Sequence, residues 1–238
     1  MKKLLFLSAL FLIGAASFGQ VKFGVNAGLN LSKIGQNFKD PANEFKTKLN
    51  PGFRLGLAIN YEIGESLDLI TGLNYTQKGF SLDLEDGLAS GETVEGYDRF
   101  NLGYLEVPIN VAYKLKNFRF MAGPYVAFGV NGKNKWDYKY SFNGQVFEDA
   151  DEDSNYKFKN KLGEKELNDN NSYTKAVDFG LNIGVGYDIN GILINANYGL
   201  GLSNLVPKTD VAGVTDDSKD FKMTNRVISI GATYFFGG

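Results

Sequence analysis

The chain of 238 residues contains no cysteine and no histidine. Without cysteine there is no disulfide bond, no thiolate metal site and no lipid-modified N-terminal cysteine. Without histidine, Ser-His-Asp and Cys-His catalysis are excluded, and so are metals held by imidazole. The formal net charge of −2 gives no reason to expect nucleic acid as a partner.

The chain is also poor in long apolar runs. One such run covers residues 4–16, directly after two lysines, and it is shorter than the roughly 20 residues that a membrane-spanning helix needs. Small residues occupy the −3 and −1 positions before Gln20, as they do at a signal-peptidase site. The pattern predicts a signal peptide over residues 1–19, cleaved after Gly19, and one mature domain over 20–238.

Residues 176–202 carry the clearest structural signal in the mature chain. Apolar side chains alternate over 177–189 and again over 192–202, with Asn190-Gly191 between the two runs. A period of two indicates a strand with one apolar face, and Asn-Gly between two such runs predicts a hairpin. The other face holds glycine and asparagine rather than the lysine, glutamate and threonine of a hydrated sheet. An apolar outside and a compact polar inside are typical of a membrane β-barrel.

The same alternation recurs along the whole mature chain. It predicts an all-β fold, an eight-stranded antiparallel up-and-down transmembrane β-barrel after the N-terminal signal peptide. The expected strands are 21–34, 52–63, 67–79, 103–115, 118–131, the pair within 176–202, and 224–236.

Short and long connections alternate between these strands. The turns at Gly64–Ser66, Lys116-Asn117 and Asn190-Gly191 are tight, and each keeps the apolar residues of its two strands on one face. The long connections are the expected outer loops, and they are the predicted contacts with other envelope proteins: 35–51, 80–102, 132–175 and 203–223. Short periplasmic turns and long outer loops are the pattern of an outer-membrane barrel, whose other partner is outer-membrane lipid.

Two further features modify the strand prediction. Pro108 and Pro124 fall inside strands, almost opposite each other, where a missing N–H predicts an irregular ladder or a bulge. In the third long loop, aromatic residues alternate with polar ones over 136–142 and Asn143-Gly144 follows, which predicts a hairpin that projects beyond the membrane. The acidic run 148–153 lacks the glycine and the ligand spacing of a calcium loop, so we expect a solvated charged segment and no metal or cofactor.

Aromatic and charged residues recur at matched depth near the tight turns. Four outward tyrosines are expected to form an interfacial girdle: Tyr61, Tyr113, Tyr187 and Tyr234. Inward charges at the same end number three of each sign: Lys22, Glu62, Asp68, Lys114, Arg119 and Asp188.

Because an unpaired buried charge is costly, the inward charges should pair. We expect Asp68 to pair with Lys114, and Arg119 with Asp188. Higher in the lumen, Arg54 and Glu106 are expected to interact. A salt-bridged plug is favoured over a path for protons or ions, since side chains nearly fill an eight-stranded barrel.

Five segments together resemble a known family: LDLITGLNYTQKGF, GYLEVPINVAYKL, FRFMAGPYVAFGV, VDFGLNIGVGYDINGILINANYGLGLSNL and NRVISIGATYFFGG. They are similar to the PorT-like outer-membrane β-barrel family, within the wider group of OmpA/OmpX-like eight-stranded barrels. The resemblance covers about Val21 to Phe236. It implies an integral barrel of the outer membrane of a Gram-negative cell without enzymatic activity, and PorT-like members are linked to protein secretion.

Four functions compete on this basis. The first is a structural or interaction barrel that contacts envelope components through its outer loops. The second is a narrow channel or small-solute transporter. The third, a soluble lipocalin-like barrel, requires an apolar inside and a hydrated outside, which is the reverse of this pattern. The fourth is an outer-membrane enzyme, and against it the chain has no histidine and no recognisable nucleophile motif.

Overall fold

The computed structural model describes residues 20–39, 46–83, 92–169 and 171–236. The predicted signal peptide therefore lies outside the described residues. In chain order the elements are β1 (Val21–Phe38), β2 (Thr47–Lys48), β3 (Asn50–Glu62), β4 (Leu67–Asp83), β5 (Glu92–Leu115), β6 (Phe118–Phe142), β7 (Gln145–Phe158), β8 (Lys161–Leu162), α2 (Glu164–Leu167), β9 (Ser172–Thr174), β10 (Val177–Ile189), β11 (Ile192–Gly201), β12 (Lys208–Thr209), the 3-10 turn η2 (Asp217–Lys219) and β13 (Phe221–Phe236).

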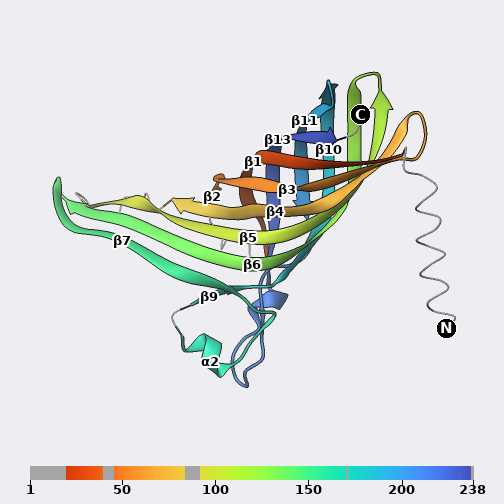
Figure 1. Cartoon of the computed structure of the whole chain (residues 1–238). Coiled ribbons are helices and arrows are strands. Elements are labelled where there is room, and N and C mark those ends of the chain that lie inside the picture. Colours follow the sequence, from red (N-terminus) through yellow and green to blue (C-terminus); the bar gives the residue numbers. More distant parts are fainter. Residues whose placement is uncertain (1–19, 40–45, 84–91, 170, 237–238) are drawn as a thin grey trace.

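Eight of these strands close into one antiparallel ring. The order is β10-β11-β13-β1-β3-β4-β5-β6, and β6 pairs with β10 to complete the circle. Neighbours in the ring are neighbours in sequence apart from β7 and the small elements, which is an up-and-down barrel (Figure 1). The predicted fold class is confirmed. In the described part of the chain, no helix has the length and apolarity needed to cross a membrane.

The outer face of the ring is apolar and the inner face is polar. Leu29, Ile183 and Ile230 are 71%, 63% and 61% exposed on the outside, whereas Asn60 and Asn225 on the inside are fully buried. In a soluble protein this distribution would be inverted. It fits a bilayer, where apolar side chains face lipid and the closed ring satisfies the backbone hydrogen bonds.

The tight turns set the register as the sequence predicts. Leu115 pairs with Phe118 across one turn, and Ile189 pairs with Ile192 across another. Asn190 and Gly191 have φ of 49° and 83°, the two positive angles of a type I′ turn. The apolar residues of adjacent strands therefore share the outer face.

The two prolines interrupt the ladders of β5. Pro108 pairs with Tyr125, but the β5–β6 ladder then skips two residue pairs and resumes at Val111 and Ala122. On the other side, the β4–β5 ladder skips the positions opposite Pro108, and Thr71 Oγ1 donates a hydrogen bond of 2.7 Å to the Pro108 carbonyl. The predicted irregular ladder is confirmed.

Several strands run further than the alternation indicates. β1 ends at Phe38, β4 at Asp83 and β6 at Phe142, while β5 already begins at Glu92. Much of the expected loop 80–102 is therefore strand, which the sequence analysis does not anticipate, whereas the strands within 132–175 agree with the hairpin predicted there. Outside the bilayer the solvent no longer enforces an apolar face, so the sequence pattern fades while the hydrogen-bonded ladders continue.

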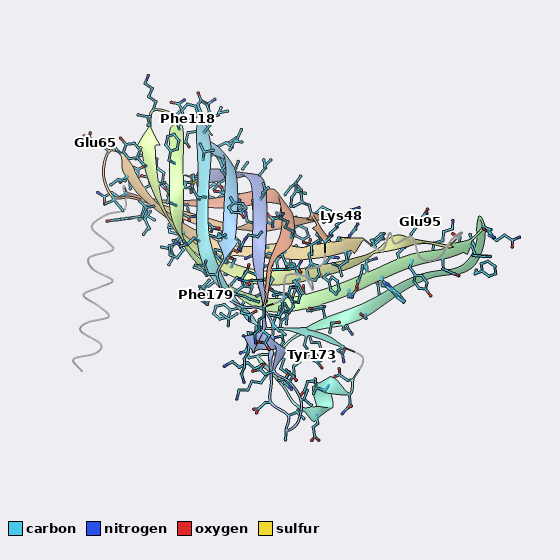
Figure 2. The ribbon with its side chains drawn as sticks, turned by 180° about the vertical axis from the view of Figure 1, so that it is seen from behind. Lys48, Glu65, Glu95, Phe118, Tyr173 and Phe179 are labelled. Atoms are coloured by element: carbon cyan, nitrogen blue, oxygen red, sulfur yellow. The ribbon has the colours of Figure 1, made fainter. Side chains whose placement is uncertain are left out.

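The extended strands form a second structural feature, which we call the projecting sheet. It consists of residues 92–103 of β5, 131–142 of β6, and β7, with the end of β4 alongside. It leaves the barrel at the end opposite the tight turns; Glu95 lies far out on it, while Phe118 marks the turn end (Figures 1 and 2). The hairpin predicted at Asn143-Gly144 is confirmed, with φ of 48° and 78° at the two turn residues.

Candidate functional site: the filled lumen and the projecting sheet

A neutral charge network closes the lumen at the turn end. The Arg119 guanidinium contacts Asp188 Oδ2 at 2.5 Å and Asp68 Oδ2 at 2.6 Å, and Lys114 Nζ lies 3.0 Å from Asp68 Oδ1. The carboxylate of Asp68 is fully buried. The structure thus brings together both pairs that the sequence places at this depth and joins them through Arg119. The remaining two inward charges at this end, Lys22 and Glu62, pair with each other at 3.1 Å.

An apolar layer lies next to this network. The inward residues that follow Asp68 and Arg119 along their strands are Ile70 and Met121, and they pack in one buried cluster with Ala58, Ala112, Leu193 and Phe235. The Arg119 guanidinium lies 6.0 Å from the ring centre of Phe235. The sequence analysis expects small residues and paired charges inside the barrel, and it does not anticipate this apolar layer.

Above the apolar layer is a polar cavity of about 70 Å³. Its lining is rich in amides, among them Asn26, which donates to Asn74 Oδ1 at 2.8 Å. Arg54 also lines it and donates to Asn195 Oδ1 at 3.3 Å. A cavity of this size and polarity has room for a few water molecules.

The expected interaction of Arg54 with Glu106 is electrostatic and not a direct ion pair, since the Glu106 charge acts on the Arg54 guanidinium from a distance. Both residues line the cavity, but Glu106 Oε2 forms its ion pair with Lys78 Nζ, at 2.7 Å. Arg54 is on β3 and Glu106 is on β5, so they are two strand spacings, about 10 Å, apart. Lys78 comes from β4, the strand between them, and reaches the carboxylate first.

Lys78 forms the centre of a second network at the mouth of the barrel. Its ammonium contacts Asp178 Oδ2 at 3.0 Å as well as Glu106, and it lies 4.1 Å from the ring centre of Tyr125. Asp178 accepts further hydrogen bonds from Ser203, Tyr125 and Asn225 at 2.8, 3.2 and 2.8 Å. The side chains of Lys78 and Asp178 are 3% and 0% exposed.

The alternation of the sequence contains a signal for Lys78 and Asp178, the centre of this second network, although both lie toward the ends of their expected strands. Lys78 has the same strand parity as inward Asp68 on β4, and Asp178 has the same parity as inward Asp188 on β10. Each lies near the end where its strand passes into an expected long loop. Both lie within the expected strands 67–79 and 177–189, so the alternation already places them on the inward face, although the sequence analysis does not single them out as a pair.

The four tyrosines of the expected girdle all lie on the outer face near the turn end. Their exposed fractions are 36% for Tyr61, 49% for Tyr113, 39% for Tyr187 and 47% for Tyr234. Tyr187 packs edge-on against Phe118 with ring centres 4.9 Å apart, so phenylalanine rings join the same belt.

A bulge in β6 divides the barrel wall from the projecting sheet. Gly129 pairs with Tyr104, but Gly103 pairs with Asn131, so Val130 is an extra residue with no partner in β5. Val130 is 48% exposed on the lipid face, and Asn131 next to it also points outward, where its Oδ1 accepts a hydrogen bond from the Tyr75 hydroxyl at 3.2 Å. Inward and outward positions of β6 therefore exchange parity at this point.

The exchange gives the projecting sheet two unlike faces. The face continuous with the lipid-facing wall carries Lys133, Lys135 and Lys139 on β6. The face continuous with the lumen carries the alternate residues: Trp136, Tyr138, Tyr140 and Phe142. Trp136 and Phe142 are 37% and 40% exposed, and the ring centres of Trp136 and Tyr138 are 4.5 Å apart. Below them the aromatic face continues into the stacked pair of Phe80, which is buried, and Phe100, which is half-buried.

Comparison with known proteins gives one family and a set of solved structures. The sequence matches the family described as outer membrane protein beta-barrel domain over residues 15–206. Among solved structures, the Ail attachment invasion locus protein of Yersinia pestis is 16% identical, with 91% of this chain and 99% of that chain covered and a TM-score of 0.40. OprG of Pseudomonas aeruginosa is 15% identical, with 92% and 97% covered and a TM-score of 0.37. The protease OmpT of Escherichia coli is 9% identical, with 91% and 95% covered and a TM-score of 0.31. Among curated protein sequences, none matches this chain.

Proposed function

Because the chain belongs to the family of outer membrane protein β-barrel domains and lies in the cell outer membrane, we propose that it is a non-enzymatic interaction barrel. In this proposal the lumen has a structural role, and the projecting sheet binds another component of the cell envelope. Residues 1–19 direct export and are removed, which N-terminal sequencing of the mature protein tests by a start at Gln20.

The observation that carries the proposal is the aromatic face of the projecting sheet. Trp136 and Phe142 remain more than a third exposed although they lie outside the apolar wall of the ring. Exposed aromatic residues with a polar face behind them are the usual composition of a protein-binding surface. A barrel that served only as a filled plug would gain nothing from a long sheet held out in water.

The finer proposal concerns the partner. The PorT-like resemblance supports a component of a protein-secretion system, in which the barrel assists transport without conducting it. Deletion of the protein would then reduce the amount of secreted protein outside the cell while leaving outer-membrane permeability unchanged. An unchanged secreted fraction would separate this protein from that role.

Site-specific crosslinking in native outer membranes tests the interaction surface. A photoreactive residue at Phe142, on the aromatic face, is expected to give a discrete adduct, whereas one at Lys139, on the polar face of the same strand, is the matched control. Trp136→Ala should remove the adduct and leave folding intact, as judged by the heat-dependent gel shift. Equal adducts from both faces would contradict a binding role for the aromatic face.

A narrow channel is the second candidate, and the polar cavity of about 70 Å³ favours it. Conductance of the purified protein in planar bilayers distinguishes the two. The interaction proposal expects no steady current, since the charge network and the apolar layer fill the lumen at the turn end. A reproducible open pore would support transport instead.

A further inference from the structure

The lipid-facing wall is hollowed beside the β5–β6 turn. A groove of about 630 Å³ crosses β5, β6, β10 and β11, over the small side chains of Ala122 and Ala196. Tyr113 and Phe120 border it toward the turn end, and Tyr198 lies on the opposite side. A second hollow of about 260 Å³ shares Ala196 and continues toward the tight turns. We call the two together the outer groove.

The position of the outer groove determines what can fill it. Ala122 is four residues beyond Phe118, where β6 begins, and is therefore about 13 Å along the strand from the turn. The groove thus lies in the leaflet next to the tight turns. Since the ring is closed, the wall offers no open strand edge to which a protein strand could add. An acyl chain of the surrounding bilayer therefore fits the groove better than an added β-strand does.

The charge at the turn below indicates the headgroup. Lys116, in the β5–β6 turn, is exposed, and among the described residues no carboxylate lies within 4 Å of its ammonium group. It follows Tyr113 by three residues, a distance of about 10 Å along the strand. An ammonium group at the interface attracts an anionic headgroup, and the phosphodiester is the anion common to glycerophospholipids.

From this geometry we propose that the outer groove is a lipid-binding site, which holds one acyl chain of a glycerophospholipid with its phosphate at Lys116. On the flat parts of the wall a lipid chain touches protein on one side. In the groove the chain meets the rings of Tyr113 and Phe120, the side of Tyr198 and the exposed backbone over Ala122. Many weak contacts of this kind add up to retention of one lipid molecule.

The test uses folded protein in vesicles that contain phosphatidylglycerol with a photoactivatable acyl chain. Adducts mapped by mass spectrometry are expected in peptides covering 118–123 and 183–198, several-fold above those on the β1 face over 23–31. Ala122→Trp fills the groove and should lower these adducts several-fold. Ala232→Trp is the matched control, because Ala232 is also small and exposed on the lipid face but does not line the groove. Uniform labelling around the barrel, or labelling unchanged by Ala122→Trp, would overturn the proposal.

A second measurement tests the headgroup separately. Lys116 has φ of 55°, a conformation that asparagine adopts readily, so Lys116→Asn removes the charge and preserves the turn. Native mass spectrometry after detergent washing is expected to show one retained phospholipid on the wild type and several-fold less on Lys116→Asn. Equal retention would remove the phosphate contact from the proposal. A crosslink between two copies at the groove in place of lipid would show that the occupant is a second barrel.

Discussion

The ion pairs at the barrel mouth allow a quantitative prediction through Lys78→Met. This change keeps the length of the side chain and removes its charge. Glu106 Oε2 and Asp178 Oδ2 lie 2.7 and 3.0 Å from the same nitrogen, so they are no more than about 6 Å apart and become an uncompensated like-charge pair. At about 6 Å and an effective dielectric constant of about 20, their repulsion is about 3 kcal/mol.

Burial supports a loss of that size. The side chains of Lys78, Glu106 and Asp178 are 3%, 9% and 0% exposed. Removal of one partner from a buried ion pair costs about 3–5 kcal/mol in proteins. We therefore expect Lys78→Met to lower the free energy of unfolding by about 3 kcal/mol. The double variant Lys78→Met/Glu106→Gln should recover most of that loss, because the second negative charge is gone.

Urea titration of the barrel in lipid vesicles, followed by the heat-dependent gel shift, measures the change. The matched control is Lys135→Met, which breaks a pair with Asp153 at 3.7 Å whose side chains are 49% and 48% exposed. Exposed pairs contribute about 1 kcal/mol or less, so this control should stay close to the wild type. If Lys78→Met were as mild as the control, the mouth of the lumen would be hydrated and the reasoning would fail.

Three further predictions concern the wall, the strand packing and the segment of α2 and β9. Ile183→Lys, on the lipid face, should lower stability by about 2–4 kcal/mol in the same titration if its depth is near the midplane; a neutral result would contradict the lipid assignment of that face. A Cβ at Gly72 would lie 2.0 Å from a backbone carbonyl oxygen, whereas one at Gly64 would meet nothing within 4 Å, so Gly72→Ala should cost about 1–3 kcal/mol and Gly64→Ala should be neutral. The Tyr173 hydroxyl donates a hydrogen bond to Asp169, which lowers the pKa of Asp169 and raises the pKa of Tyr173 to about 12. Tyr173→Phe should therefore raise the pKa of Asp169 in an NMR titration, and the local stabilisation should be present at neutral pH and be lost as pH falls through the lowered pKa.

The barrel itself could be predicted because its signals are local. Alternation and tight turns such as Asn190-Gly191 define each hairpin within a few residues, and three turns that agree in parity determine the register of three hairpins. The pairing of Arg119 with Asp188 follows from the same parity. The hairpins need no knowledge of residues distant in the sequence, whereas the Arg119–Asp188 pair, 69 positions apart, also requires that β6 lie beside β10.

The remaining features depend on contacts that the pattern does not contain. The partner of Glu106 is decided by which of several inward cations has the shortest reach, and that depends on the shear of the closed ring. The apolar layer around Phe235 is formed by strands from both ends of the chain. The bulge at Val130 leaves no mark in the composition, because valine fits a regular strand equally well. Without the bulge, Trp136 would be assigned to the face of the projecting sheet that is continuous with the lipid-facing wall.

The bulge at Val130 also has a consequence for how such a protein can change over time. One extra residue exchanges the inward and outward positions of β6. The side-chain pattern of the projecting sheet therefore differs from that of the barrel wall. Residues that pair across the β6–β7 hairpin can be gained or lost two at a time at its turn, and the apolar side chains of the wall keep facing the lipid. The outer part can therefore be lengthened, shortened or resurfaced to meet a new environment while the membrane-embedded cylinder keeps its sequence constraints.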